Sequence, residues 1–181
     1  ILNERYPAAD VLCAQNANFQ KLWNRNATHR DFMYHRIGIG ALPFPSEVSV
    51  PQERFMLHKD DMTDRPKQIR EKYKELKNVP IGVDLLEHPL IGIVGGTKKR
   101  GAFEIAKLLL AQIAASNCYT DVKVALTYDQ NNTEEKEAFE MFRWLPHTWS
   151  ADKKSRYVAG TDEEAADVYY ELTQIVRERA E

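Results

Sequence analysis

The hydrophobic pattern changes near residue 78 and divides the chain into two parts. In the first part, residues 1–78, apolar residues fall weakly at helical spacing from Arg5 to about Arg25, and alternation predicts a strand at Met33–Leu42. Prolines interrupt the next stretch and leave a short strand near Val48–Val50. The polar run Arg65–Lys77 is interpreted as a short exposed helix. The pattern therefore predicts an N-terminal helix and strand segment that packs on the part that follows.

The second part, residues 79–181, alternates short apolar runs with amphipathic stretches. The predicted strands are Ile81–Leu85, Leu90–Val94, Val122–Tyr128 and Arg156–Ala159. The predicted helices are Ala102–Ala115, Thr133–Trp144 and a last one from Thr161 to Arg179. Leu90–Val94 is continuously apolar, as in a strand buried on both faces. This order predicts an α/β fold, in which right-handed crossovers build a parallel sheet with helices on both faces.

Local capping signals support two of these helices. Asn132 precedes the helix at Thr133, with Glu135 at the capping-box position, and Thr161 has Glu164 three residues later. Each pair supplies a side chain that satisfies backbone N–H groups at the start of a helix.

The composition is that of an ordinary globular domain, with 43% hydrophobic and 29% charged residues in a chain of 181. A net charge of −2 without a basic tail argues against a nucleic-acid binder. The two cysteines and five histidines show no ligand spacing, so no metal site is predicted. The apolar runs are too short to span a membrane, so no membrane insertion is expected.

A candidate phosphate loop follows Leu90–Val94. Gly96 and Gly101 have the separation of the two glycines of a P-loop, whose backbone N–H groups hold phosphates. The next two positions require Lys and Ser or Thr, but they are Ala102 and Phe103. The residues of this candidate loop are Gly95, Gly96, Thr97, Lys98, Lys99, Arg100, Gly101 and Ala102. Because the phosphates and magnesium lose their partners, we expect no catalytic residue, and weak nucleotide binding is the alternative to a degenerate basic loop.

Two further residues are candidates for contacts. Asp129 ends the predicted strand Val122–Tyr128, and ligand crevices form at the carboxyl ends of such strands. It is either a ligand contact or an exposed acid at the end of a strand. His147 lies in an aromatic-rich loop with no nucleophile beside it, so it is interpreted as a packing or domain contact.

Three stretches of the sequence resemble a known family. They are Leu22-Trp23-Asn24-Arg25 with Asp31-Phe32 and Arg36-Ile37-Gly38-Ile39-Gly40, then Val83-Asp84-Leu85 with Ile91-Gly92-Ile93-Val94-Gly95-Gly96, and last Trp144-Leu145-Pro146-His147 with Gly160-Thr161-Asp162-Glu163-Glu164-Ala165. In this order they resemble the FtsK/SpoIIIE ATPases of type VII secretion, the EssC/EccC proteins, over most of the chain after Lys21. The first stretch resembles the segment after the membrane anchor, and the other two resemble the first ATPase-like unit.

The resemblance implies a P-loop NTPase-like sheet of the RecA/FtsK type in the unit that is sometimes called the zeroth ATPase domain. It implies a cytoplasmic domain of a membrane-anchored bacterial protein, with other domains of the same ATPase and membrane components of the secretion machine as partners. The strand that carries the Walker B acid in that family follows a helix like the one ending near Arg179, so the core is expected to be truncated before it. No cofactor is required, and ATP with magnesium is the alternative.

Three functions are therefore open. The first is a non-catalytic or regulatory module that couples the membrane segment to downstream ATPase domains during protein export. The second is an active or weakly active ATP-binding and hydrolysing domain, with Lys98 or Lys99 in place of the missing lysine. The third is an α/β domain unrelated to secretion, because βαβ folds serve many functions.

Overall fold

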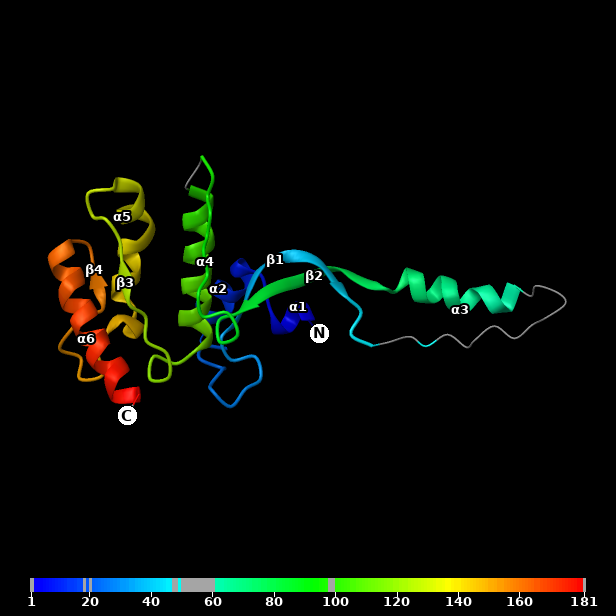
Figure 1. Ribbon diagram of the computed structural model, residues 1–181, viewed down its shortest axis with the longest axis horizontal. Helices are drawn as coiled ribbons and strands as arrows, with labels where there is room; N and C mark the ends of the chain where they lie inside the picture. Colours follow the sequence, from blue (N-terminus) through cyan, green and yellow to red (C-terminus); the bar gives the residue numbers. More distant parts are fainter. Residues whose placement is uncertain are drawn as a thin grey trace.

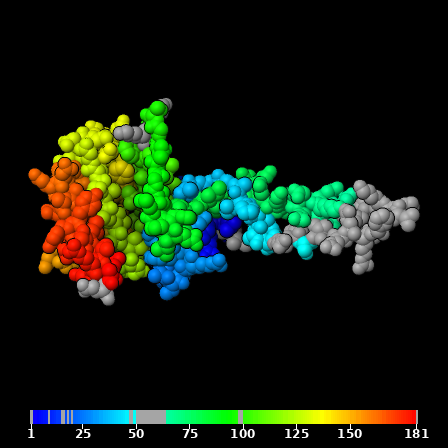
Figure 2. Space-filling model, viewed as in Figure 1, coloured from blue at the N-terminus to red at the C-terminus, as the bar shows by residue number. Residues whose placement is uncertain are grey.

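A long arm and a body of helices and short strands make up the structure (Figure 1). The computed structural model describes residues 2–17, 19, 21–46, 49, 61–97 and 100–180. The arm consists of strand β1 (Tyr34–Pro43), helix α3 (Asp61–Lys72) and strand β2 (Glu75–Asp84). The space-filling view shows the arm as a narrow extension of the wider body (Figure 2). Of the strand expected near Val48–Val50, only residue 49 lies within the described part of the chain.

β1 and β2 pair in an antiparallel sheet whose register runs from Tyr34 opposite Asp84 to Pro43 opposite Glu75. The strand expected at Met33–Leu42 is confirmed, whereas β2 begins well before the expected Ile81 and runs across the predicted division at residue 78. Gly82 is needed where the strands approach closely, because a Cβ there would lie 2.6 Å from the carbonyl oxygen of His35. The helix expected up to Lys77 ends at Lys72, because the residues that follow pair with β1.

The N-terminal segment holds two short helices, α1 (Leu2–Arg5) and α2 (Ala9–Ala17). The helix expected up to Arg25 therefore ends early. Trp23 has a φ of 54°, a left-handed conformation that a continuing helix does not contain. Its backbone N–H donates instead to the carbonyl of Ala115, and that of Arg25 donates to Ser116. These residues run beside the end of another helix instead of forming their own.

The described part of the body contains two long α-helices, one shorter α-helix and two very short strands. Its elements are α4 (Arg100–Ser116), β3 (Leu126–Thr127), α5 (Thr133–Phe139), the 3₁₀ helices η1 (Glu140–Trp144) and η2 (Pro146–Thr148), β4 (Val158–Ala159) and α6 (Asp162–Ala180). β3 and β4 are parallel, as expected of a βαβ connection, and α6 covers β4 with Val168 in its buried cluster. The helix expected at Thr133–Trp144 changes from α to 3₁₀ geometry after Phe139.

Both predicted helix starts are confirmed. The side chain of Asn132 accepts from the N–H groups of Glu134 and Glu135 at the start of α5. At the start of α6 the hydroxyl of Thr161 accepts from Glu164 N at 3.2 Å, and the Glu164 carboxylate accepts from Gly160 N at 2.8 Å. These starts depend on neighbouring residues, which is why the sequence predicts them well.

The predicted strand Leu90–Val94 is wrong for this structure. Residues 88–95 have no strand or helix geometry, and Leu90 and Val94 are each 93% exposed. The sheets among the described residues have two strands each, so a P-loop-type parallel sheet with helices on both faces is not what the structure contains. A strand is held in place by hydrogen bonds to a neighbouring strand, and neither of the described sheets includes this run.

Candidate functional site

Most of the described part of the candidate phosphate loop is exposed, and Gly95 and Ala102 are half-buried. Gly96, Thr97, Arg100 and Gly101 are open to solvent, while Lys98 and Lys99 lie outside the described residues. Gly96 has a φ of 60°, so the chain turns there through a conformation that glycine adopts without steric cost. Gly96 and Thr97 lie in a turn, and Arg100, Gly101 and Ala102 form the first turn of α4.

Phe103 follows the candidate phosphate loop, where the P-loop sequence pattern requires a hydroxyl for magnesium. Its ring contacts Phe139 of α5 with centroids 5.6 Å apart and planes at 80°, the edge-to-face geometry that aromatic pairs prefer. The side chain thus holds α4 against α5. At this position the chain has a packing contact in place of a ligand for a metal ion.

A cavity of about 450 Å³ lies next to this contact, between α4 and α5. It is lined by Arg100, Phe103, Glu104, Lys107, Glu134, Glu137 and Ala138. The ammonium of Lys107 is already paired with Glu104 at 3.0 Å. With three carboxylates facing two cations, the cavity does not favour a polyphosphate, which needs a net positive surrounding.

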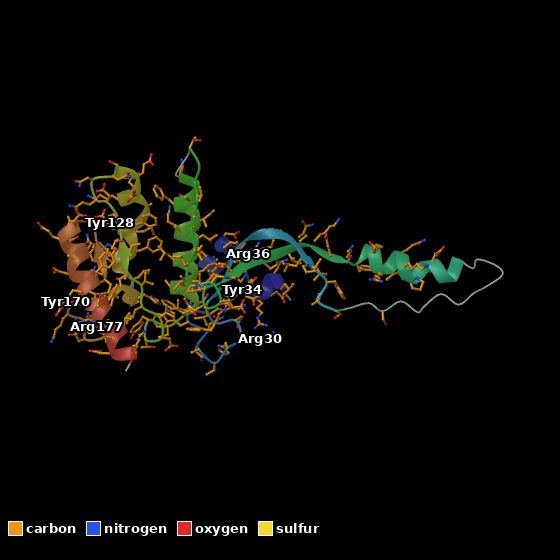
Figure 3. All side chains as sticks on the ribbon, viewed as in Figure 1. Arg30, Tyr34, Arg36, Tyr128, Tyr170 and Arg177 are labelled. Atoms are coloured by element: carbon orange, nitrogen blue, oxygen red, sulfur yellow. The ribbon has the colours of Figure 1, made fainter. Side chains whose placement is uncertain are left out.

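A larger cavity of about 780 Å³ lies where β3 and β4 end and α6 begins. Its lining residues are Thr127, Tyr128, Asp129, Asn131, Ala159, Gly160, Thr161, Asp162, Glu163, Ala165 and Tyr169. The backbone keeps the two ends together, because Tyr128 N donates to Ala159 O at 3.1 Å and Gln130 N donates to Gly160 O at 3.1 Å. Figure 3 places Tyr128 in this part of the body.

Asp129 lines this cavity together with two more acids, Asp162 and Glu163. Its carboxylate accepts from Asn131 N at 2.9 Å, a local turn contact. No lysine or arginine is among the lining residues, so the cavity repels phosphate despite the helix start beside it. Burial raises the pKa of the Tyr128 hydroxyl, which therefore stays protonated at neutral pH.

The structure does not bring the candidate loop and Asp129 together. Arg100, at the end of the loop, lines the cavity between α4 and α5, whereas Asp129 lines the cavity at the strand ends, and the two cavities share no lining residue. A single nucleotide site built from both sets of residues is therefore absent from the described part of the chain.

The first of the three family-like stretches forms a joint between the arm and the body. We define the joint as Trp23, Arg25, Tyr34, Arg36 and Gln112 together with the backbone of Ala114–Ser116. The indole of Trp23 donates to Ala114 O at 3.1 Å, and the guanidinium of Arg25 donates to Tyr34 O at 2.7 Å. Figure 3 shows Tyr34 and Arg36 at the base of the arm, where β1 meets α4.

Gln112 connects α4 to β1 within the joint. Its side-chain oxygen accepts from Arg36 N at 2.9 Å, and its amide donates to Arg36 O at 2.7 Å. It thereby pairs with the backbone of β1 as a neighbouring strand would. The residue was missed as a functional candidate, although one glutamine in the apolar run Leu108–Ala115 was the signal that could have revealed it.

Three charged residues hold the N-terminal segment on the joint. The carboxylate of Asp31 accepts from Arg5 Nε at 2.9 Å and lies 3.7 Å from Arg25 Nε. The hydrogen bond from Arg5, aided by the charge of Arg25, lowers the pKa of Asp31. Asp31 therefore stays ionised and keeps both guanidinium groups in place.

His147 is buried against the joint. Its Nε2 lies 2.8 Å from Asn117 O, and its ring is 6.4 Å from those of Trp23 and Tyr119. Burial lowers the pKa of the imidazole, so it is neutral and Nε2 donates to the carbonyl. The interpretation of His147 as a packing contact is confirmed.

Within the described ranges no group of three or more His, Cys, Asp or Glu side chains could hold a metal ion. None of the described helices has the length and apolar character needed to cross a membrane.

Comparison with known proteins gives a consistent set of relatives, although no family model matches. The ESX secretion system protein EccC of Geobacillus thermodenitrificans is 27% identical over 161 residues, which is 88% of this chain. The ESX secretion system protein YukB of Bacillus subtilis is 23% identical over 160 residues, and the type VII secretion system protein EssC of Staphylococcus aureus is 24% identical over 147 residues, or 88% and 81% of this chain. The match covers 10% of each relative, so the chain spans about a tenth of their length.

Proposed function

The chain belongs to the EccC/EssC family of type VII secretion proteins, and we propose that it is a non-catalytic module that couples neighbouring parts of such a protein during export. The observation that carries the proposal is the contact of Phe103 with Phe139. The residue that would ligate magnesium in a P-loop instead packs two helices together.

The surrounding charges support the absence of catalysis. Transfer of a phosphoryl group requires cations placed where negative charge develops. The cavity beside Phe103 holds Glu104, Glu134 and Glu137, and the strand-end cavity holds acids without a cation. No cofactor is required in this proposal.

The joint supports a coupling role. β1 is hydrogen-bonded along its length to β2, and through Gln112 and Trp23 the base of the arm is hydrogen-bonded to α4. A force on the arm therefore reaches α4, and through Phe103 it reaches α5. The partners in this proposal are other domains of the same protein and membrane components of the secretion machine.

The first experiment tests the absence of catalysis. We expect the chain, incubated with magnesium and ATP, to release no phosphate above the rate in buffer, and calorimetric titration to show no saturable heat. The double variant Lys98→Ala, Lys99→Ala is expected to behave as the parent does. Lys153→Ala, Lys154→Ala is the matched control, because it removes two adjacent lysines elsewhere.

The opposite result identifies the alternative function. Magnesium-dependent phosphate release that Lys98→Ala, Lys99→Ala abolishes and the control pair retains would mean that the domain is an active hydrolase with an unconventional loop. Nucleotide binding without turnover that depends on the same two lysines would mean a regulatory nucleotide site.

A second experiment tests coupling in the whole secretion protein. Gln112→Leu removes both hydrogen bonds between α4 and Arg36 and is expected to reduce export, while the amount of secretion protein in the membrane stays the same. Gln174→Leu, on α6, is the control for the same chemical change. Unimpaired export with a broken joint would refute the coupling role.

A further inference from the structure

An aromatic groove lies on the body at the turn that contains η1 and η2. It encloses about 490 Å³, and its walls include Tyr119, Lys123, Trp144, Pro146, Trp149 and Lys153. None of these residues belongs to the joint, to the candidate phosphate loop or to the strand-end cavity. The proposed coupling function leaves the groove without a role.

The aromatic wall is held rigidly although it faces solvent. The guanidinium of Arg156 lies 4.2 Å from the ring centre of Trp149 and 5.0 Å from that of Trp144. It also donates to Arg143 O at 2.8 Å, which fixes the arginine itself. Trp144 nevertheless remains 73% exposed. A large ring that is ordered before binding loses little conformational entropy when a partner covers it.

The groove carries positive charge that no neighbour neutralises. Lys123 and Lys153 line it, and no carboxylate does. Within the described part of the chain, neither lysine forms an ion pair. The Lys123 ammonium instead lies 5.5 Å above the ring of Tyr119. Both ammonium groups are therefore free to pair with an arriving carboxylate.

The nearby acids are occupied by contacts of their own. Asp152 accepts from the Ser150 hydroxyl at 2.6 Å and from Lys154 N at 3.2 Å. The first of these hydrogen bonds lowers the pKa of Asp152 most. Asp121 accepts from the Thr120 hydroxyl at 3.1 Å. The two acids thus stabilise their own loops and do not line the groove.

The loop that presents Lys153 is also fixed. The hydroxyl of Ser150 accepts from the backbone N–H groups of Lys154 and Ser155, and Ser150 N donates to Ser155 O at 2.9 Å. These bonds hold Lys153 at a φ of 58°, a left-handed conformation unusual for a residue with a Cβ. Such a conformation costs on the order of 1 kcal/mol or more and persists only where the surrounding structure enforces it.

We propose that this groove binds an acidic peptide segment of a partner protein, with an aromatic or aliphatic side chain packed against the exposed Trp144 and Pro146 and with carboxylates on Lys123 and Lys153. Exposed aromatic rings with flanking cations fit that chemistry, because the ring contact gives area and the ion pairs give selectivity. A single-stranded nucleic acid also stacks on aromatic rings. A nucleic acid carries one phosphate for every nucleotide, whereas the groove offers two lysines on a chain of net charge −2, and this modest positive charge favours a short acidic peptide.

Fluorescence titration of the whole chain with short synthetic peptides tests the proposal. A peptide of alternating glutamate and phenylalanine is expected to bind and to change tryptophan emission, and its glutamine counterpart is expected to bind at least about tenfold more weakly. Added salt should weaken only the first of these two interactions. An oligothymidine of similar length is the probe for nucleic acid.

Two variants assign any binding to the groove. Trp144→Ala and the pair Lys123→Gln, Lys153→Gln are each expected to weaken binding of the glutamate peptide about tenfold or more. The matched controls are Tyr170→Ala, which removes an exposed ring from α6, and Arg177→Gln, Arg179→Gln, which removes two cations from the same helix (Figure 3). Both controls should bind as the parent does.

The peptide titrations and the variants together test whether the groove binds an acidic peptide. Selective binding of the glutamate peptide that both groove variants lose supports the proposal. No binding, equal binding of the glutamine peptide, or binding that the α6 controls lose as strongly would overturn it. Tighter binding of oligothymidine would also overturn it, in favour of a nucleic-acid surface. Because the changed side chains are exposed, far-UV circular dichroism is expected to be the same for all variants.

Discussion

Replacing Gln112 by leucine is the most direct perturbation of the joint. The glutamine side chain is 7% exposed and fills a site between α4 and β1. Leucine has nearly the same size, so no large cavity is created. It removes both the acceptor for Arg36 N and the donor to Arg36 O. The change therefore isolates the hydrogen bonds from the packing.

The expected loss of stability follows from the backbone groups of Arg36 that leucine leaves without a hydrogen-bond partner on α4. A buried donor or acceptor without a partner costs about 1–3 kcal/mol. Arg36 N and Arg36 O both lose their partner on α4, and β2 pairs with β1 irregularly there because the register shifts between Arg36 and Gly38. We therefore expect a loss of about 2–4 kcal/mol, which is a large part of the 5–15 kcal/mol typical of a domain.

Urea denaturation followed by circular dichroism measures this loss, with Gln174→Leu on α6 as the control. The control should change the free energy of unfolding by less than about 0.5 kcal/mol, as is usual away from buried networks. Amide exchange of Arg36 gives a local measure, because its N–H should exchange faster in Gln112→Leu only. A loss below about 1 kcal/mol with unchanged Arg36 exchange would refute the joint as a stabilising contact.

Two further predictions concern pH and helix capping. Burial lowers the pKa of His35 from 6.5 to about 4, so the unfolded chain binds the proton more tightly and stability is lost as pH falls from about 6.5 to 4, by about 3 kcal/mol in total. His35→Leu should match the parent within about 1 kcal/mol at pH 7, because neither ring nitrogen has a hydrogen-bond partner among the described residues. In urea melts at pH 4 the variant should lose less stability than the parent, and an unchanged pH profile would contradict the assignment. Thr161→Ala removes the cap of α6 and should lower the free energy of unfolding by about 1 kcal/mol in a thermal melt. Thr173→Ala, within the same helix, should be nearly neutral, and equal effects of the two changes would argue against the cap.

Local interactions decided which parts of the fold the sequence could predict. The helices α4 and α6 and the caps at Asn132 and Thr161 depend on residues a few positions apart, and all were predicted. The strand β1 was predicted because its alternation is local. Its partner β2 was predicted only from Ile81 onward, because the residues from Glu75 to Val79 are mostly polar and exposed, and their pairing with β1 joins positions far apart in the sequence.

The sequence identified single residues of the candidate site but not the residues that lie next to them in space. Asp129 was predicted at the end of a strand and lies two residues after the end of β3, but the acids that share its cavity come from the start of α6. The joint brings together Trp23, Arg36 and Gln112, which no local pattern connects. The role of Phe103 required knowledge of its partner Phe139, which lies on another helix.

The run Leu90–Val94 shows why a correct local pattern does not ensure a strand. Its apolar residues are those of a strand buried on both faces, and the helix predicted to follow it is present as α4. Yet Leu90 and Val94 are almost fully exposed, because a strand acquires its geometry from hydrogen bonds to neighbours. Among the described residues the parallel sheet consists of β3 and β4 alone. The phosphate loop also depends on a strand before it, since backbone N–H groups converge on a phosphate only when the preceding strand fixes the turn. The exposed run and the exposed part of the loop therefore have one physical cause, because the described residues directly before α4, 88–97, pair with no strand.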